Sequence, residues 1–226
     1  MKKTTILAFA AGVLSTGSLA MLIASGPEHD EHGSEHGNEH ANHDDHHDGV
    51  NPDEMDAMME MSPEDMMAAM AKLATPDEHH KALGVMVGNW KAHTSFIMDP
   101  SAPPTEGEGT MSVQWVLGGR YIQSNFKMDF MGQPFEGLGY TGYDIAHSQY
   151  VSTWMDTMST KITYMKGGEE EGDALVMHGM STTPMGDNPM KIVTKITDEN
   201  TWVDNFYDKM PDGTWMNSGT ITYTRQ

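Results

Sequence analysis

Apolar and polar side chains alternate with a period of two residues from residue 89 onward, and this alternation limits the fold more than any other feature of the chain. In one segment Met190, Ile192 and Ile196 alternate with Lys191 and Lys195. Residues two apart in a β-strand share a face, so one face can meet a core while the other meets solvent. The pattern therefore predicts an all-β domain.

Turn signals such as Gly167-Gly168 and Pro211-Asp212-Gly213 divide this region into short strands. The predicted strands are residues 89–98, 107–117, 120–129, 134–143, 149–156, 159–166, 173–182, 189–197, 201–209 and 214–225. Short connections favour an antiparallel meander, and closing the sheet removes its two unpaired edges. The predicted fold class is a closed antiparallel up-and-down β-barrel of about ten strands over residues 85–226.

A methionine-rich segment at residues 51–84 predicts one or two short helices before the barrel. The run from Ser62 to Asp65 supplies an N-cap, a first-turn proline and two acids near the positive end of the helix dipole. Thr75 and Glu78 have the spacing of a capping box, which predicts a second helix over residues 76–83. Thioethers could bind Cu⁺, or the methionines could form an amphipathic docking helix. The methionines concerned are Met55, Met58, Met59, Met61, Met66, Met67 and Met70.

Residues 1–25 have the pattern of an export signal. Lys2 and Lys3 precede an uncharged stretch, and Ser18-Leu19-Ala20 offers a small-residue cleavage site before Met21. The alternative is an uncleaved membrane anchor, since about 20 uncharged residues can span a bilayer. Under either interpretation the rest of the chain is predicted to lie outside the cytoplasm, in the periplasm or secreted.

Residues 26–50 are acidic, rich in histidine and poor in apolar residues, so a disordered tail is expected. Interleaved imidazoles and carboxylates suit Cu²⁺, Zn²⁺ or Ni²⁺. Metal binding is expected only above about pH 6, because imidazole must be neutral to bind a metal. The alternative is a solvated spacer. The candidate ligands are His29, His32, His36, His40, His43, His46 and His47.

The charge balance and the lack of cysteine exclude several classes of function. The chain has 13 Lys and Arg against 33 Asp and Glu, a net charge of −20. This charge argues against nucleic acid and against an anionic membrane surface as partners. The chain has no cysteine, which excludes disulfides, thiolate metal sites and a cysteine nucleophile.

The triplet Gly88-Asn89-Trp90, at the start of the first predicted strand, resembles the Gly-x-Trp signature of the calycin superfamily of lipocalins and fatty-acid-binding proteins. In those barrels the tryptophan closes one end, and an arginine from the last strand packs across it. The resemblance implies that Gly88, Trp90 and Arg225 close this barrel. Parity agrees, since Ile221 and Tyr223 share a face with Arg225, and the same counting places Trp215 on that face.

A longer set of motifs resembles the bacterial family called domain of unknown function 1579. The resemblance covers roughly residues 76–226, and it implies a calycin-like barrel without implying an activity. The motifs are Asp77-Glu78-His79-His80-Lys81, Val87-Gly88-Asn89-Trp90, Leu117-Gly118-Gly119-Arg120-Tyr121, Gly139-Tyr140-Thr141-Gly142-Tyr143-Asp144, the run from Thr153 to Thr160, and Thr222-Tyr223-Thr224-Arg225.

A barrel of this size can enclose one small molecule, and the alternating positions predict which residues line it. Val113 is the alternative to Gln114, because the sequence alone does not decide which face of that strand points inward. Asp156 shares a face with Trp154; if it points inward, Arg120 or Tyr143 is its expected partner, and otherwise it lies at a hairpin. The candidates are Phe96, Gln114, Phe126, Tyr143, Trp154, Asp156, Ile192 and Phe206.

His93, His147 and His178 do not converge in this pattern, so neither a haem nor a zinc site is expected in the barrel. The predicted function is therefore a non-enzymatic, exported barrel that binds a small apolar or amphipathic molecule and requires no cofactor. The alternative is an extracytoplasmic protein that binds or buffers Cu, Zn or Ni through its tail and Met-rich helix. A third possibility is an enzyme that uses Asp156 with Tyr143.

Overall fold

A computed structural model describes residues 59–170 and 174–226, and it forms two units that are treated separately below. One unit contains the barrel and the short helices that directly precede it, and the other contains helix α2 (Pro63–Ala74). Within the described residues, no helix is both long enough and apolar enough to cross a membrane.

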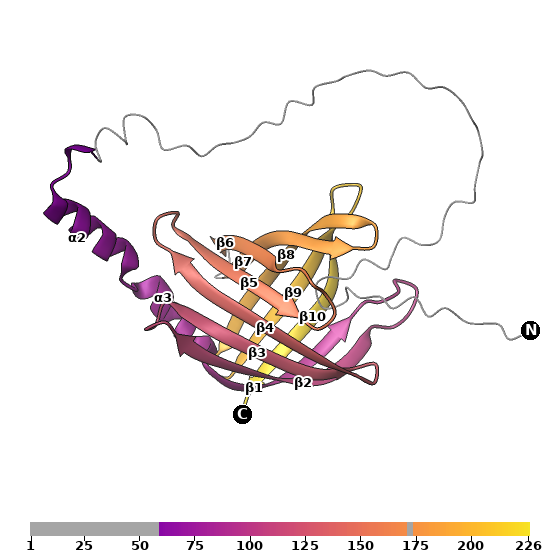
Figure 1. Ribbon diagram of the computed structural model, residues 1–226. Coiled ribbons are helices and arrows are strands. Elements are labelled where there is room, and N and C mark those ends of the chain that lie inside the picture. Colours follow the sequence, from indigo (N-terminus) through magenta and orange to yellow (C-terminus); the bar gives the residue numbers. More distant parts are fainter. Residues whose placement is uncertain (1–58, 171–173) are drawn as a thin grey trace, which may run out of the picture. The chain divides into compact units, whose positions relative to one another are not determined.

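The barrel is closed, antiparallel and built from ten strands in chain order, as the alternation predicted (Figure 1). Each strand pairs with its sequence neighbours, and the first strand also pairs with the last. The strands are β1 (Gly88–Phe96), β2 (Thr105–Val116), β3 (Tyr121–Phe130), β4 (Gln133–Asp144), β5 (Gln149–Asp156), β6 (Thr163–Glu170), β7 (Ala174–Thr183), β8 (Gly186–Asp198), β9 (Thr201–Lys209) and β10 (Trp215–Arg225).

Strand β6 starts four residues later than the expected residue 159. The carboxylate of Asp156 accepts a hydrogen bond from the backbone N–H of Met158 at 2.9 Å, and the hydroxyl of Ser159 accepts one from Lys161 at 3.0 Å. These side chains satisfy backbone donors locally, so the connection takes a turn where strand pairing was expected.

A β-bulge in β10 corrects the face assigned to Trp215. Asn217 lies opposite Tyr207, but Gly219 lies opposite Phe206, so Ser218 is an extra residue in the ladder. One extra residue reverses the parity of everything before it. Trp215 therefore lies on the other face from Ile221, and its ring lies near Lys191 and Lys209.

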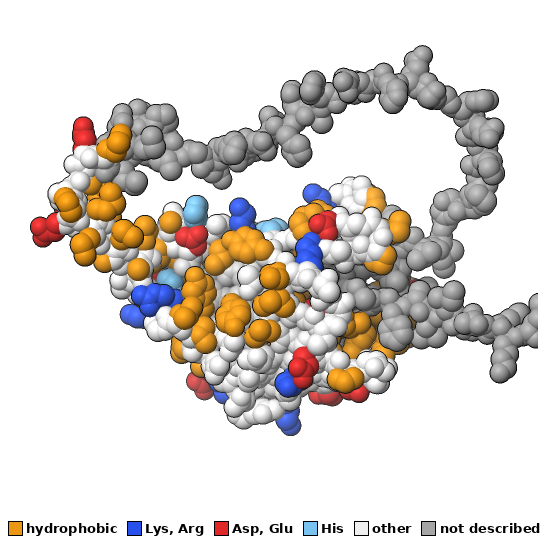
Figure 2. Space-filling model, viewed as in Figure 1, with side chains coloured by type: hydrophobic (Ala, Val, Ile, Leu, Met, Phe, Trp, Pro, Cys, Tyr) orange, Lys and Arg blue, Asp and Glu red, His pale blue; other side chains and the backbone are white. Residues whose placement is uncertain are grey.

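Helix α2 begins where the sequence predicted, with the Ser62 hydroxyl accepting the N–H of Asp65 at 3.1 Å. None of its residues is buried, and Met67, Met70 and Leu73 are largely exposed. Figure 2 shows hydrophobic side chains along this helix.

The second helix is α3 (Glu78–Ala82), followed by the 3₁₀ turn η1 (Leu83–Met86). Its capping box uses Asp77 and His80, so the assignment of Thr75 and Glu78 is wrong. Asp77 accepts hydrogen bonds from the N–H groups of both His79 and His80, whereas the Thr75 hydroxyl donates back to Ala71 at the end of α2. An aspartate is a stronger acceptor at an N-cap than a threonine, because it carries a full charge.

Candidate ligand cavity inside the barrel

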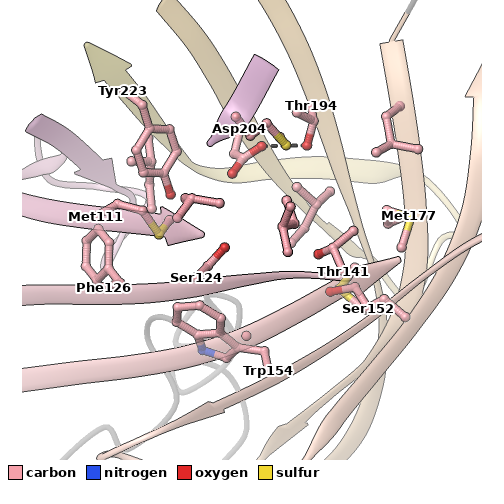
Figure 3. A pocket seen from close by; sticks show the side chains of 18 of the residues that line it. Met111, Ser124, Phe126, Thr141, Ser152, Trp154, Met177, Thr194, Asp204 and Tyr223 are labelled. Atoms are coloured by element: carbon pink, nitrogen blue, oxygen red, sulfur yellow. Dashed lines mark hydrogen bonds between the residues drawn. The ribbon is translucent and has the colours of Figure 1, made fainter. Parts of the chain in front are cut away.

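The barrel encloses a cavity of about 150 Å³ between its strands (Figure 3). Strands β2 to β10 and the turn η1 all contribute to its wall, so the cavity depends on the closed sheet. The wall is mostly apolar, and thioethers are prominent in it because they fill irregular spaces and can change rotamer. The methionines of the wall are Met86, Met111, Met165, Met177 and Met190.

Asp204 is the carboxyl group in this wall. It points inward from β9 between Trp202 and Phe206, and only 9% of the residue is exposed. The Thr194 hydroxyl on β8 donates to its Oδ1 at 2.5 Å. Burial raises the pKa of Asp204 to about 7, although the hydrogen bond from Thr194 lowers it. Near neutral pH this carboxyl group is therefore poised between its charged and neutral forms.

Two aromatic residues with polar atoms lie beside Asp204. Trp202 and Tyr223 stack at 3.9 Å between ring centroids and both line the cavity. Burial raises the pKa of the Tyr223 phenol well above its usual value, and the negative charge of Asp204 adds to this. Trp202 is 5% exposed, and its indole N–H finds no acceptor among the described residues. A buried donor without an acceptor is costly, so the packing of Trp202 against Tyr223 must offset this loss.

The predicted contact between Trp90 and Arg225 is present. The guanidinium carbon lies 4.1 Å from the centroid of the Trp90 ring, which is 1% exposed. Arg225 also donates to the carbonyls of Val85, Val87 and Glu199 at 2.8–3.0 Å. We call this region the Trp90 end of the barrel.

Gly88 is required at the Trp90 end for two reasons. Its φ of 143° disfavours other residues, and a Cβ atom there would lie 2.5 Å from a guanidinium nitrogen of Arg225. The indole N–H of Trp90 donates to the Met86 carbonyl at 2.8 Å. The Gly-x-Trp signature thus allows the arginine to pack closely over the indole ring.

The structure places four predicted lining residues in the cavity wall: Phe126, Trp154, Ile192 and Phe206. Phe96 is buried, but it is not part of the wall. Its ring packs against that of Phe206, with 5.8 Å between the ring centroids.

The assignment of Gln114 to the interior is wrong. Its side chain is exposed on the outer face of β2, where it donates to Gln123 at 2.8 Å, and the alternative Val113 lines the cavity. Residues Met111 and Val113 are the buried ones on this strand, so Gln114 faces outward by parity.

Tyr143 and Asp156 are partly buried but do not belong to the cavity wall. Tyr143 stacks on the His79 ring of α3 at 4.1 Å. Asp156 accepts the indole N–H of Trp154 at 3.0 Å, so its observed partner is this indole and not Arg120 or Tyr143. The carboxylate fixes the orientation of an indole that forms part of the wall.

His93, His147 and His178 each have partners of their own in the barrel. His93 is exposed between Glu106 and Glu108, with a 3.0 Å contact to each carboxylate. His147 contacts Asp144 at 2.7 Å in a turn, and His178 lies against the ring of Trp215. The part of the chain that the structure describes contains no cluster of three His, Asp or Glu residues suited to a metal ion.

Several predictions fall outside the described residues. These are the signal at residues 1–25, the seven tail histidines from His29 to His47, and two methionines of the Met-rich segment, Met55 and Met58.

Among the residues of the cavity wall that were not predicted from the sequence are Asp204, Thr194, Trp202 and Tyr223. Parity could have found all four. Trp202 and Asp204 are even numbers of positions from Phe206, a predicted inward residue, Thr194 is two positions from Ile192, and Tyr223 shares a face with Arg225. A charged residue at an inward position is a signal in itself, since an unpartnered carboxylate is rarely buried.

The fold and the site together define a closed β-barrel with an internal, mainly apolar cavity. Residues 75–225 match the family model described as "Protein of unknown function (DUF1579)", so the chain belongs to that family. A comparison with curated proteins found no match. Among solved structures, a redesigned beta barrel aligns with 64% of this chain and 95% of its own length, at 14% identity and a TM-score of 0.34.

Proposed function

We propose that this chain is an exported, non-enzymatic protein that binds a small apolar or amphipathic molecule inside its barrel. The observation that carries the proposal is the cavity itself. A well-packed interior leaves few voids larger than a water molecule, whereas this barrel leaves about 150 Å³ in one place. An engineered apolar cavity of about this size binds benzene.

The chemistry of the wall supports a ligand with a polar group attached to an apolar body. Aromatic rings and thioethers form much of the wall, and Asp204 with Thr194 places a carboxyl group in it. Hydroxyl side chains such as Ser124, Thr141 and Ser152 add further polar atoms on other strands (Figure 3). This combination is typical of small-molecule sites, where a few polar groups fix the orientation of a mostly apolar ligand.

Native mass spectrometry of the protein purified from its own host tests the proposal. The expected result is a bound molecule that appears as added mass. Ser124→Leu should fill part of the cavity and remove the added mass, because Ser124 lies in the wall (Figure 3). The matched control is Ser112→Leu, the same change at an exposed position of β2. Equal added mass on both variants, or none on the wild type, would contradict the proposal.

A second function rests on the sequence of the tail. Seven histidines among the residues from Pro27 to Gly49 favour binding of Cu, Zn or Ni, independently of the barrel. Deleting this segment separates the two functions. The deletion should abolish metal binding and leave the molecule in the barrel.

A further inference from the structure

The cavity wall contains one kind of charge. Among the residues that line it, Asp204 is the carboxyl group, Tyr223 is the other titratable side chain, and no Lys, Arg or His is present. A ligand with a carboxylate or phosphate would therefore bring its charge into an apolar space without a counterion, at a high desolvation cost. A ligand with a positive charge would find a carboxylate.

We propose that the ligand is a small amine with an apolar, preferably aromatic body, whose ammonium group pairs with the Asp204 carboxylate. This inference rests on the proposed function, since it names the chemical class of the molecule in the barrel. Thr194 donates to Oδ1 of Asp204 and thereby holds the carboxyl group in place from the neighbouring strand. A buried ion pair needs such additional hydrogen bonds to offset desolvation.

The aromatic residues of the wall suit the rest of such a ligand. Figure 3 shows Trp154 on the opposite side of the cavity from Asp204, with Phe126 and Tyr223 at another side. The faces of aromatic rings attract an ammonium group, and the same rings provide contact area for an apolar body. The net charge of −20 also raises the local concentration of cations around the protein.

The groups that face Asp204 predict how binding depends on pH. Among the wall residues next to Asp204, Tyr223 on β10 has a titratable side chain. Thr194 and Ile192 on β8 carry no charge. On its own strand, Trp202 and Phe206 flank it, and the buried Asp208 lies four residues further along. With a pKa near 7, Asp204 must lose its proton before it can pair with an ammonium ion. The affinity should therefore rise on the order of 20-fold between pH 5.5 and pH 7.5.

Three probes with the same ring separate the possible head groups: benzylamine, benzyl alcohol and benzoate. Each is titrated into the full chain while the intrinsic tryptophan fluorescence, to which Trp154 and Trp202 of the wall contribute, is followed. We expect benzylamine to bind at least 10-fold more tightly than benzyl alcohol, and benzoate to bind most weakly. Asp204→Asn should remove the preference for the amine and keep the binding of the alcohol, because its amide has the shape of the carboxyl group without its charge.

The outcomes distinguish the two proposals. Binding of benzyl alcohol at least as tight as that of benzylamine, with no effect of Asp204→Asn, would overturn the amine assignment and leave the cavity as a ligand site. Failure of all three probes to bind would overturn both proposals for ligands of this size. The pH dependence is measured on the wild type, so it tests the assignment even if Asp204→Asn does not fold. An amine affinity that is constant between pH 5.5 and pH 7.5 would contradict it.

Discussion

Two neighbouring regions of the barrel interior differ in how completely their buried polar groups are hydrogen-bonded. At the Trp90 end, Arg225 donates to three backbone carbonyls and Trp90 donates to a fourth. Around the cavity, Trp202 leaves its N–H without an acceptor among the described residues, and Asp204 accepts a hydrogen bond from the Thr194 hydroxyl. The two regions adjoin on the inward face of β10. Tyr223 of β10 lies opposite Trp202 of β9 beside the cavity, and Arg225, two residues further along β10, ends the strand at the Trp90 end. The Trp90 end is therefore held together by side-chain hydrogen bonds to the backbone, whereas the cavity wall keeps a buried donor without an acceptor among the described residues.

The largest expected effect is that of Arg225→Ala. The variant loses a cation–π contact of about 0.5–2 kcal/mol and leaves the carbonyls of Val85, Val87 and Glu199 without their donor. We expect the free energy of unfolding to fall by about 3 kcal/mol, as measured by urea denaturation. Arg225→Lys is the control and should recover only part of this loss, since an ammonium group lacks the planar fork. An unchanged unfolding midpoint for Arg225→Ala would show that this end is not a stabilising unit.

The second prediction concerns the pH dependence of stability at the cavity. The pKa of Asp204 is about 7 in the folded protein, above the ordinary value of 3.8. Between these two values the folded state keeps a proton that the unfolded state loses, so the contribution of Asp204 to stability declines as the pH rises from about 4 to 7. Asparagine does not titrate. The stability of Asp204→Asn relative to wild type should therefore increase by about 2–3 kcal/mol between pH 5 and pH 8.

Urea denaturation of both proteins at pH 5 and pH 8 measures this difference. Asp187→Asn is a useful control, because hydrogen bonds from Thr182 and Lys161 lower the pKa of that exposed carboxylate. Both the folded and the unfolded pKa of Asp187 lie below pH 5, so the stability of this variant relative to wild type should stay constant between pH 5 and pH 8. A constant difference between Asp204→Asn and wild type would place Asp204 in a solvated environment and weaken the contrast between the two regions.

The smallest expected effect comes from a matched pair of indole substitutions. Trp90→Phe removes the donor to the Met86 carbonyl, whereas Trp202→Phe removes an N–H that has no acceptor among the described residues. Both lose similar ring area, so the difference between them isolates the hydrogen bond and the stronger cation–π surface of indole. We expect Trp90→Phe to cost about 1–2 kcal/mol more than Trp202→Phe. Equal losses in thermal unfolding would remove the distinction.

The strands could be predicted from the sequence because each needs only a local signal. Alternation sets the face of a residue, and Gly, Pro, Asn and Asp mark the ends of each strand. This was sufficient for ten strands and for barrel closure, whereas the contact of Trp90 with Arg225 was implied by the resemblance to calycin barrels, with which the alternation agreed. It failed at Ser218, because a bulge is a property of two paired strands and cannot be read from one of them.

The cavity could be predicted only in part, for a related reason. Which inward residues border empty space depends on how all the strands pack, so Phe96 and Phe206 look alike in sequence although only Phe206 lines the cavity. The environment of Asp204 depends in turn on Thr194, its partner on the adjacent strand. By contrast, the failure at Gln114 was one of local parity, which Met111 and Val113 would have resolved.

Closure of the barrel between β1 and β10 also determines the order in which the molecule can fold. Residue 90 pairs with residue 225, so the sheet cannot close until the last strand has been synthesised. Such distant pairing slows folding, and until it forms, β1 and the growing end of the sheet both present open edges that can aggregate. A chain of this topology therefore spends its synthesis without a native structure. Completion of β10 is therefore required before the native barrel can form.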